Sequence, residues 1–195
     1  FVEVALGGSP REVELFTWID SGALEAGWAL RFDALSATMV AMITLVSSMI
    51  HVYSIGYMQG DPGIPRFMSY LSLFTFAMLM LVTANNLVQM FFGWEGVGLT
   101  SYLLIGFWYE RPSANAAALK AFIVNRVGDF GFMLGICGVF FAVGSVEFDT
   151  IFAAVPSMVG RELDFLGMRL DLLTTLCLLL FIGAMGKSAQ LGLHT

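Results

Sequence analysis

Five long apolar stretches limit what this chain can fold into more than any other feature of its sequence. A helix needs about 20 apolar residues to cross the hydrocarbon core of a bilayer. Stretches of about this length occupy residues 32–57, 68–84, 86–108, 115–142 and 172–193. Apolar residues make up 58% of the chain and charged residues 12%, whereas soluble domains are about 45–50% apolar and ~25% charged. The sequence therefore predicts an all-α polytopic membrane protein with about five transmembrane helices.

The breaks between the first four stretches carry turn-forming residues. Asn85-Asn86 divides the second stretch from the third so closely that a tight antiparallel helical hairpin is expected. Asp61-Pro62-Gly63 and Pro65 interrupt the chain between the first and second stretches, and Arg111-Pro112-Ser113 does so between the third and fourth. These signals favour separate helices over one continuous apolar segment.

Residues 1–31 differ from the rest of the chain. Residues 13–18 and 28–32 are rich in β-forming side chains and flank Ser21-Gly22, a pattern typical of a hairpin. We therefore expect a short extramembrane β-hairpin, followed by a transmembrane bundle over residues 32–195.

Residues 145–171 separate the last two apolar stretches and are amphipathic and acidic. Residues 148–155 within them are predicted to form a short interfacial helix. The chain opens on Phe1 and closes within an apolar pattern, so we expect an internal piece of a longer protein, truncated at both ends.

Charge and cysteine usage argue against other kinds of protein. A net charge of −6 disfavours a nucleic-acid partner, which requires a basic surface. Cys137 and Cys177 lie in apolar runs without metal-ligand spacing, so they are expected to be small buried residues and not a zinc or disulfide site.

Four ionisable residues stand inside the predicted spans: Glu95, Arg126, Asp129 and Lys187. Such a side chain costs about 2.5–3.5 kcal/mol at the centre of a transmembrane helix and usually faces protein or a water-filled path. At 1.5 Å per residue, Glu95 lies roughly 14 Å into its stretch. These positions therefore indicate function, and proton transfer is the chemistry that such groups serve.

Glu95 is surrounded by glycines in Gly93-Trp94-Glu95-Gly96-Val97-Gly98. Small residues let a second helix approach closely, which would place the carboxylate in protein and away from lipid. The alternative is a protonated glutamic acid that only joins two helices by a hydrogen bond.

In the fourth stretch, Asn125, Arg126 and Asp129 fall within roughly 100° of one another on a helical wheel, and Arg126 and Asp129 are an i,i+3 pair. Either they form a neutral structural ion pair, or Arg126 tunes a neighbouring proton carrier, since arginine does not release its proton. Lys120 lies nearer the helix end, where snorkelling to the headgroups is the alternative to a functional role.

In the fifth stretch, Lys187 has Gln190 and His194 on its face if the helix continues, an array that could hold a water file. A lysine removed from water loses part of its preference for the charged form, and a nearby carboxylate restores it. The alternative is a lysine neutralised by a fixed partner. His51, near the end of the first stretch, is a weaker candidate relay.

Several of these segments resemble the antiporter-like subunit L (subunit 5) family of NADH:quinone oxidoreductase, respiratory complex I. The resemblance covers essentially the whole chain. The segments that carry it are Gly93–Gly98 running into residues 101–108, His51-Val52-Tyr53-Ser54, Lys120-Ala121-Phe122, Asn125–Asp129, Gly186–Gln190 and Leu193-His194-Thr195.

The resemblance implies roles for the buried charges. In this family, the residues matching Glu95 and Lys187 form the charged pair of a proton half-channel, and the lysine sits on a helix broken within the membrane. Those matching Arg126 and Asp129 couple this pair to neighbouring subunits. Lys120 is assigned to the same tuning group, and His194 and His51 are candidate relay residues. The second half-channel would lie beyond Thr195.

The resemblance also implies a setting. The subunit would bind no redox cofactor and no metal itself, while flavin mononucleotide, iron–sulfur clusters and quinone would be held by other subunits. Its partners would be the bilayer, protons and other membrane subunits, especially a neighbouring antiporter-like one. A bacterial inner membrane is expected ahead of the mitochondrial one, with residues 1–31 on the periplasmic side, although lysine and arginine counts do not decide the orientation.

Two other functions remain open on the sequence. The chain could belong to a multisubunit sodium/proton antiporter, which shares the same ancestral helices. It could also be a structural membrane anchor whose charges only hold helices together.

Overall fold

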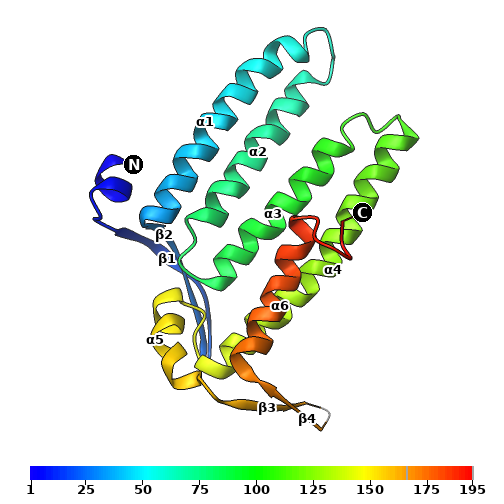
Figure 1. The fold of residues 1–195 in the computed structure, drawn as a ribbon. Coiled ribbons are helices and arrows are strands. Elements are labelled where there is room, and N and C mark those ends of the chain that lie inside the picture. The colour runs from blue at the N-terminus through cyan, green and yellow to red at the C-terminus, as the bar shows by residue number, and fades with distance from the viewer. Residues whose placement is uncertain (166, 195) are drawn as a thin grey trace. The chain divides into compact units, whose positions relative to one another are not determined.

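The computed structural model describes every residue except Leu166 and Thr195. The side chain of Phe165 is also outside the described part. Thr195, which ends the last motif of the resemblance, therefore lies outside the described residues. The chain groups into two compact units. The first comprises Phe1–Phe16, Gly27–Asn85 and Gln89–Phe122, and the second comprises Thr17–Ala26, Asn86–Val88 and the residues from Ile123 onward. Helices dominate, as predicted (Figure 1).

The predicted hairpin before the first apolar stretch is confirmed. After a π-helical turn at Val2–Leu6, strands β1 (Arg11–Ser21) and β2 (Leu24–Phe32) pair as a two-stranded sheet. Gly22 lies in the connecting turn with φ of +63°, a left-handed conformation that glycine adopts without a Cβ clash.

The first two helices, α1 (Ala34–Tyr57) and α2 (Ile64–Val82), lie side by side (Figure 1). A capping box starts α1: the backbone N–H of Ser36 donates to Asp33 Oδ1 at 2.9 Å, and that of Asp33 donates to Ser36 Oγ at 2.7 Å. Helix α2 begins four residues before the predicted boundary of 68, because Pro65 fits its first turn instead of breaking it.

Helices α3 (Leu87–Ile105) and α4 (Pro112–Val143) follow the predicted turn at Asn85-Asn86. Pro112 occupies the first position of α4, which explains why this helix begins three residues before the predicted boundary of 115. The turn is slightly longer than predicted, since α2 ends at Val82 and α3 starts at Leu87.

Three helices in the described part of the chain are long and apolar enough to cross a membrane: α1, α2 and α4. Helix α3 has 19 residues but includes polar side chains such as Gln89, Glu95 and Thr100, which lower its hydropathy. The fifth stretch gives a shorter helix, α6. That α3 and α6 also cross the bilayer stays a prediction.

The region between α4 and α6 holds more structure than predicted. The expected short helix is α5 (Phe148–Met158). It is followed by an unpredicted second hairpin of β3 (Glu162–Phe165) and β4 (Met168–Asp171), in which Leu163 pairs with Leu170 and Asp164 with Arg169. Opposite charges on facing positions favour this register.

Helix α6 (Leu172–Lys187) ends six residues before the predicted boundary at 193. The N–H of Gln190 donates to the carbonyl of Met185 at 3.1 Å, while Ala189 has a φ of +50°. This is the hydrogen-bond pattern of a Schellman motif, which ends a helix with one left-handed residue. Here an alanine holds the position that glycine usually fills, so no sequence signal marks the break.

One buried contact joins the hairpin to a helix within the first unit. Gln89 of α3 is fully buried, and its amide accepts from the N–H of Ala29 at 3.2 Å and donates to the carbonyl of Ala29 at 2.8 Å. These two bonds satisfy backbone groups of β2 that would otherwise be buried without partners. The hairpin is thereby fixed to the start of α3.

The expectation that both cysteines are buried is wrong. Cys137 on α4 and Cys177 on α6 are free and exposed in the described chain. Apolar sequence surroundings do not distinguish a residue packed against protein from one on a lipid-facing surface, because both settings are apolar.

Candidate functional site

Two of the predicted site residues meet in the second unit. Lys187, the last residue of α6, lies with its Nζ 3.6 Å from Oδ2 of Asp129 on α4. The side chains are 18% and 5% exposed, so the pair is largely removed from solvent. The separation exceeds the ~2.7–2.9 Å of a charge-assisted hydrogen bond. The geometry is that of an ion pair that is not locked in one short bond.

Glycines bring the two backbones together beside this pair. A Cβ added to Gly128 would lie 3.1 Å from the carbonyl oxygen of Ile182 and 3.2 Å from Cα of Gly186. Gly128 precedes Asp129 and Gly186 precedes Lys187 along the chain. The close approach therefore sets the distance between the two charges, as small residues do at membrane helix seams.

The end of α6 is itself part of the electrostatics. A helix carries partial negative charge at its C-terminus, which favours a cation there. Because the helix stops at Lys187, the ammonium group sits at that end beside the Asp129 carboxylate. Two sources of negative potential thus act on one lysine.

Arg126 lies one helical turn before Asp129 on α4 and is half-buried. The i,i+3 spacing places Arg126 on the same side of α4 as Asp129, the partner of Lys187. The structure therefore brings together three of the four buried charges that the sequence singled out: Arg126, Asp129 and Lys187. In this group, the Asp129 carboxylate lies with two basic residues, Arg126 and Lys187. The net charge of the group therefore depends on whether Lys187 holds its proton.

Glu95 lies on α3 in the first unit and is half-buried. Its flanking glycines contact α2 as expected: a Cβ on Gly93 would lie 2.5 Å from the backbone nitrogen of Leu81, and one on Gly96 would lie 3.0 Å from Cβ of Ala77. The predicted close helix contact at this motif is confirmed. Lys187 belongs to the other unit, so the Glu95–Lys187 pair stays a prediction.

His51 takes part in a polar network between α1 and α2. Its Nδ1 lies 2.8 Å from the carbonyl oxygen of Ser47, and its Nε2 lies 3.3 Å from Oγ of Ser72. Ser47 Oγ lies 2.7 Å from Thr75 Oγ1. The sequence pointed only to the histidine, because hydroxyl residues in apolar helices usually bond their own backbone and give no separate signal.

The remaining candidates are placed less favourably. Lys120 is exposed on α4, in keeping with the snorkelling alternative. Gln190 and His194 lie beyond the end of α6 and are exposed. The predicted array of Lys187, Gln190 and His194 on one helical face is therefore wrong, since the helix needed for that spacing ends at Lys187.

Two family descriptions match this chain. Residues 84–195 match the family described as NADH:quinone oxidoreductase/Mrp antiporter, TM. Residues 18–68 match the one described as NADH-Ubiquinone oxidoreductase (complex I), chain 5 N-terminus. The chain belongs to this family of antiporter-like membrane subunits. The buried charges of α3, α4 and α6 all lie in the part that matches the shared transmembrane family.

Named relatives agree with the assignment to complex I. NADH-ubiquinone oxidoreductase chain 5 of Chondrus crispus is 58% identical over 195 residues, which are 100% of this chain and 29% of the relative. NADH-quinone oxidoreductase subunit L of Rhodobacter capsulatus is 56% identical over 201 residues, covering 100% and 28%. Subunit L of Rickettsia bellii is 50% identical over 194 residues, covering 100% and 30%. This membrane domain thus spans about three tenths of the length of the curated relatives it matches.

Proposed function

We propose that this chain is part of a proton-translocating subunit of NADH:quinone oxidoreductase and carries one half-channel. The observation that supports this most is the Lys187–Asp129 ion pair at the interrupted end of α6. A purely structural role would be served as well by apolar residues of similar volume, since buried ion pairs contribute little net stability. A lysine beside a carboxylate that can approach and withdraw, by contrast, can gain and lose a proton.

In the proposed step, Lys187 holds its proton while a carboxylate is close and releases it when the carboxylate withdraws. The ammonium group becomes a neutral amine, and the proton passes to the next acceptor along the path. Asp129 is one such carboxylate, and Glu95 is proposed as the other. Arg126 keeps its charge throughout and so favours proton release from Lys187 by repulsion.

The proposal is tested by replacing Lys187 in the full-length protein. Lys187→Arg retains a positive charge beside Asp129 but cannot release a proton at physiological pH. Lys187→Met removes the charge. Both variants, and Glu95→Gln, are expected to weaken NADH-driven proton uptake into inverted membrane vesicles several-fold or more, as the loss of a proton-transfer group does.

Assembly of the complex, measured by native gel, is the control. If Lys187→Arg assembled and pumped like the wild type, Lys187 would serve only as a fixed charge and the structural-anchor alternative would hold. Asp129→Asn is expected to lower quinone reductase turnover as well, because coupling between proton movement and the redox reaction runs both ways. Unchanged turnover and unchanged proton uptake in that variant would contradict the role proposed for Asp129.

The sodium/proton antiporter alternative shares the transmembrane family matched by residues 84–195. The match of residues 18–68 to the chain 5 family favours complex I instead. Proton uptake that depended on NADH and not on sodium would support this preference.

The setting of the subunit is also proposed. Flavin mononucleotide, iron–sulfur clusters and quinone would be bound by other subunits, and another antiporter-like subunit would be the direct neighbour. The chain is a membrane protein, and its named relatives include bacterial subunit L proteins as well as chain 5 proteins. Location in a bacterial inner membrane, ahead of a mitochondrial one, stays a prediction.

A further inference from the structure

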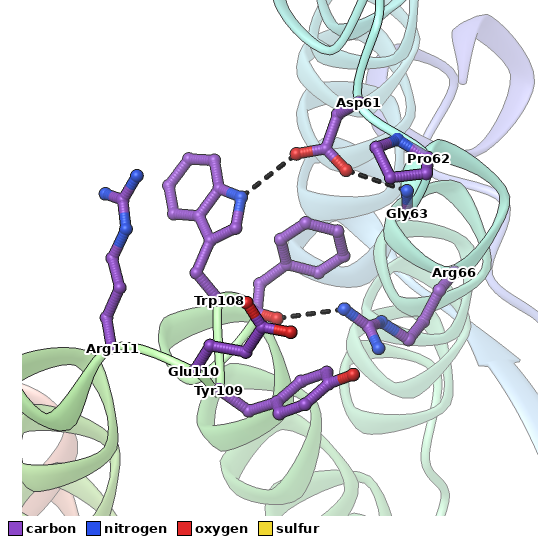
Figure 2. Close-up of a pocket in the computed structure, with 9 residues that line it drawn as sticks. Asp61, Pro62, Gly63, Arg66, Trp108, Tyr109, Glu110 and Arg111 are labelled. Atoms are coloured by element: carbon purple, nitrogen blue, oxygen red, sulfur yellow. Dashed lines mark hydrogen bonds between the residues drawn. The ribbon is translucent and has the colours of Figure 1, made fainter.

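A pocket lies where the α1–α2 and α3–α4 loops meet in the first unit (Figure 2). It has a volume of about 460 Å³. Its lining consists of Asp61, Pro62, Gly63, Arg66 and residues 107–111. Both loops join helices at the same end of the bundle. Helices α1 and α2 are long and apolar enough to cross a membrane, so their ends reach the membrane surface. The pocket therefore belongs at the level of the lipid headgroups.

The pocket walls are held in place by one hydrogen bond between the two loops and one within the α1–α2 loop. Trp108 Nε1 donates to Asp61 Oδ2 at 3.0 Å, and Gly63 N donates to Asp61 Oδ1 at 2.7 Å (Figure 2). The bond from Trp108 is the largest of the effects that keep the pKa of Asp61 below its usual value, followed by that from Gly63. Asp61 is thus a structural carboxylate whose two oxygens are both in use.

Arg66 presents its guanidinium group between aromatic rings. Its Cζ lies 4.7 Å from the ring centre of Phe107 and 4.9 Å from that of Tyr109. One nitrogen, Nη2, donates to the carbonyl of Phe107 at 3.0 Å. The Nε is buried and has no hydrogen-bond partner among the described residues. A buried donor without an acceptor is unfavourable, so an acceptor that entered beside it would be stabilised.

Two further charges stand at the rim. Arg111 lies with its Cζ 4.8 Å from the ring centre of Trp108. The carboxylate of Glu110 is exposed and makes no hydrogen bond or ion pair with any described residue. The four charged side chains that line the pocket, Asp61, Glu110, Arg66 and Arg111, cancel in formal charge. A strongly anionic ligand would face two carboxylates, whereas a zwitterion finds a partner for each of its charges.

A second cavity of about 180 Å³ adjoins the pocket and shares Arg66, Phe107 and Tyr109 with it. Its other walls include Tyr70 of α2, Tyr102 and Leu103 of α3, and Ala118 of α4. These residues lie further along the helices than the loops do, so this cavity is closer to the bilayer interior. A polar pocket that continues into a less polar one has the shape and chemistry of a lipid site.

We propose that this pair of cavities binds a zwitterionic aminophospholipid of the bilayer. The phosphodiester would accept from Arg66 and Arg111, the primary ammonium would donate to Glu110, and the start of an acyl chain would enter the second cavity. Trp108 and Tyr109 are 38% and 59% exposed, and aromatic residues of this kind are enriched at the headgroup level.

The full-length protein in its complex, purified in mild detergent and stripped of lipid, tests the proposal. Rebinding of phosphatidylethanolamine is measured by native mass spectrometry and by retention in nanodiscs. Arg66→Lys keeps the charge but loses the Nε–H and the planar group between the rings, and is expected to weaken binding about tenfold, the effect of one hydrogen bond to a charged group. Glu110→Gln, at an exposed position without partners, is expected to abolish the preference for a primary over a quaternary ammonium.

A matched substitution elsewhere on the chain tests whether binding is specific to this pocket. Arg169→Gln, which removes an exposed arginine from a surface ion pair with Glu162, is expected to leave lipid binding unchanged. Stronger binding of anionic phosphatidylglycerol, or displacement of the lipid by millimolar inorganic phosphate, would overturn the assignment to a zwitterionic lipid. Unchanged lipid retention in Glu110→Gln and Arg66→Lys would overturn the proposal, because the lipid would then be held elsewhere. If Arg66→Lys fails to assemble, Glu110→Gln decides the outcome.

Discussion

Replacing Gly128 with alanine tests whether the contact between α4 and α6 sets the geometry of the buried ion pair. The new Cβ would lie 3.1 Å from the carbonyl oxygen of Ile182 and 3.2 Å from Cα of Gly186, whereas ordinary contact begins at 3.4 Å. Both are backbone atoms that cannot rotate away. Helix α6 must therefore move by about 0.3 Å or more to relieve the overlap, at a cost of about 1–3 kcal/mol for overpacking.

The same displacement acts on the charges. Lengthening the Lys187–Asp129 distance from 3.6 Å to about 4.0 Å weakens their attraction by ~0.5 kcal/mol at an effective dielectric constant near 20. Alanine gains about 0.5–1 kcal/mol over glycine in a helix, which is less than the overpacking cost. We therefore expect Gly128→Ala to lower the free energy of unfolding by about 1–2 kcal/mol and to reduce NADH-driven proton uptake.

Gly56 provides the matched control. It lies in α1, and an added Cβ would have no heavy atom within 4 Å. Gly56→Ala is therefore expected to be neutral or slightly stabilising. Unfolding of the purified full-length proteins in SDS, followed by circular dichroism, gives the sign of each change. Equal effects of the two substitutions would refute the reasoning, because they would show that the α4–α6 contact accommodates the added methyl group with no loss of unfolding free energy.

Substitutions at three further positions test other parts of the fold. Gln89→Leu should destabilise the protein by about 2–4 kcal/mol, since it leaves the buried N–H and C=O of Ala29 unpaired; SDS unfolding would reveal this, and an unchanged midpoint would contradict it. Asp33→Ala should remove a helix cap, at a cost of about 0.5–2 kcal/mol. The bond from the backbone of Ser36 lowers the pKa of Asp33, so this contribution is present above pH ~4 and is lost as the pH falls through the lowered pKa. A cap effect that stayed constant as the pH was lowered would rule this out. Ala189→Gly should preserve the end of α6, whereas Ala189→Val should destabilise it by about 1–2 kcal/mol, because its φ of +50° is unfavourable for a branched side chain; similar stabilities for the two variants would be inconsistent with a left-handed residue there.

The sequence predicted most of the helices because a bilayer imposes long apolar segments, which are visible without a structure. The first stretch is predicted at 32–57, and the helix runs from Ala34 to Tyr57. Predicted boundaries fail at Pro65 and Pro112, because each proline occupies the first turn of a helix and does not break the chain there. The first hairpin is visible because Ser21-Gly22 separates two runs of β-formers.

The site was predicted in its components and not in its arrangement. Asp129 and Lys187 are conspicuous as charges in apolar surroundings, yet their contact is tertiary and has no periodic signal. The end of α6 depends on Ala189 in a left-handed conformation, for which the sequence offers neither glycine nor proline. The loop pocket was not predicted, because Arg66 and Arg111 lie far apart in the sequence and read singly as loop charges, although the aromatic pair Trp108-Tyr109 is typical of a membrane interface.

The hydrogen bonds of His51 also determine how it can handle a proton. Nδ1 lies 2.8 Å from the carbonyl oxygen of Ser47 and 3.3 Å from its Oγ, and Nε2 lies 3.3 Å from Oγ of Ser72 on α2. Each ring nitrogen therefore has a hydroxyl group beside it that can either donate or accept a hydrogen bond. A proton taken up at one nitrogen can leave from the other, so this imidazole is able to connect the hydroxyl groups of the two helices.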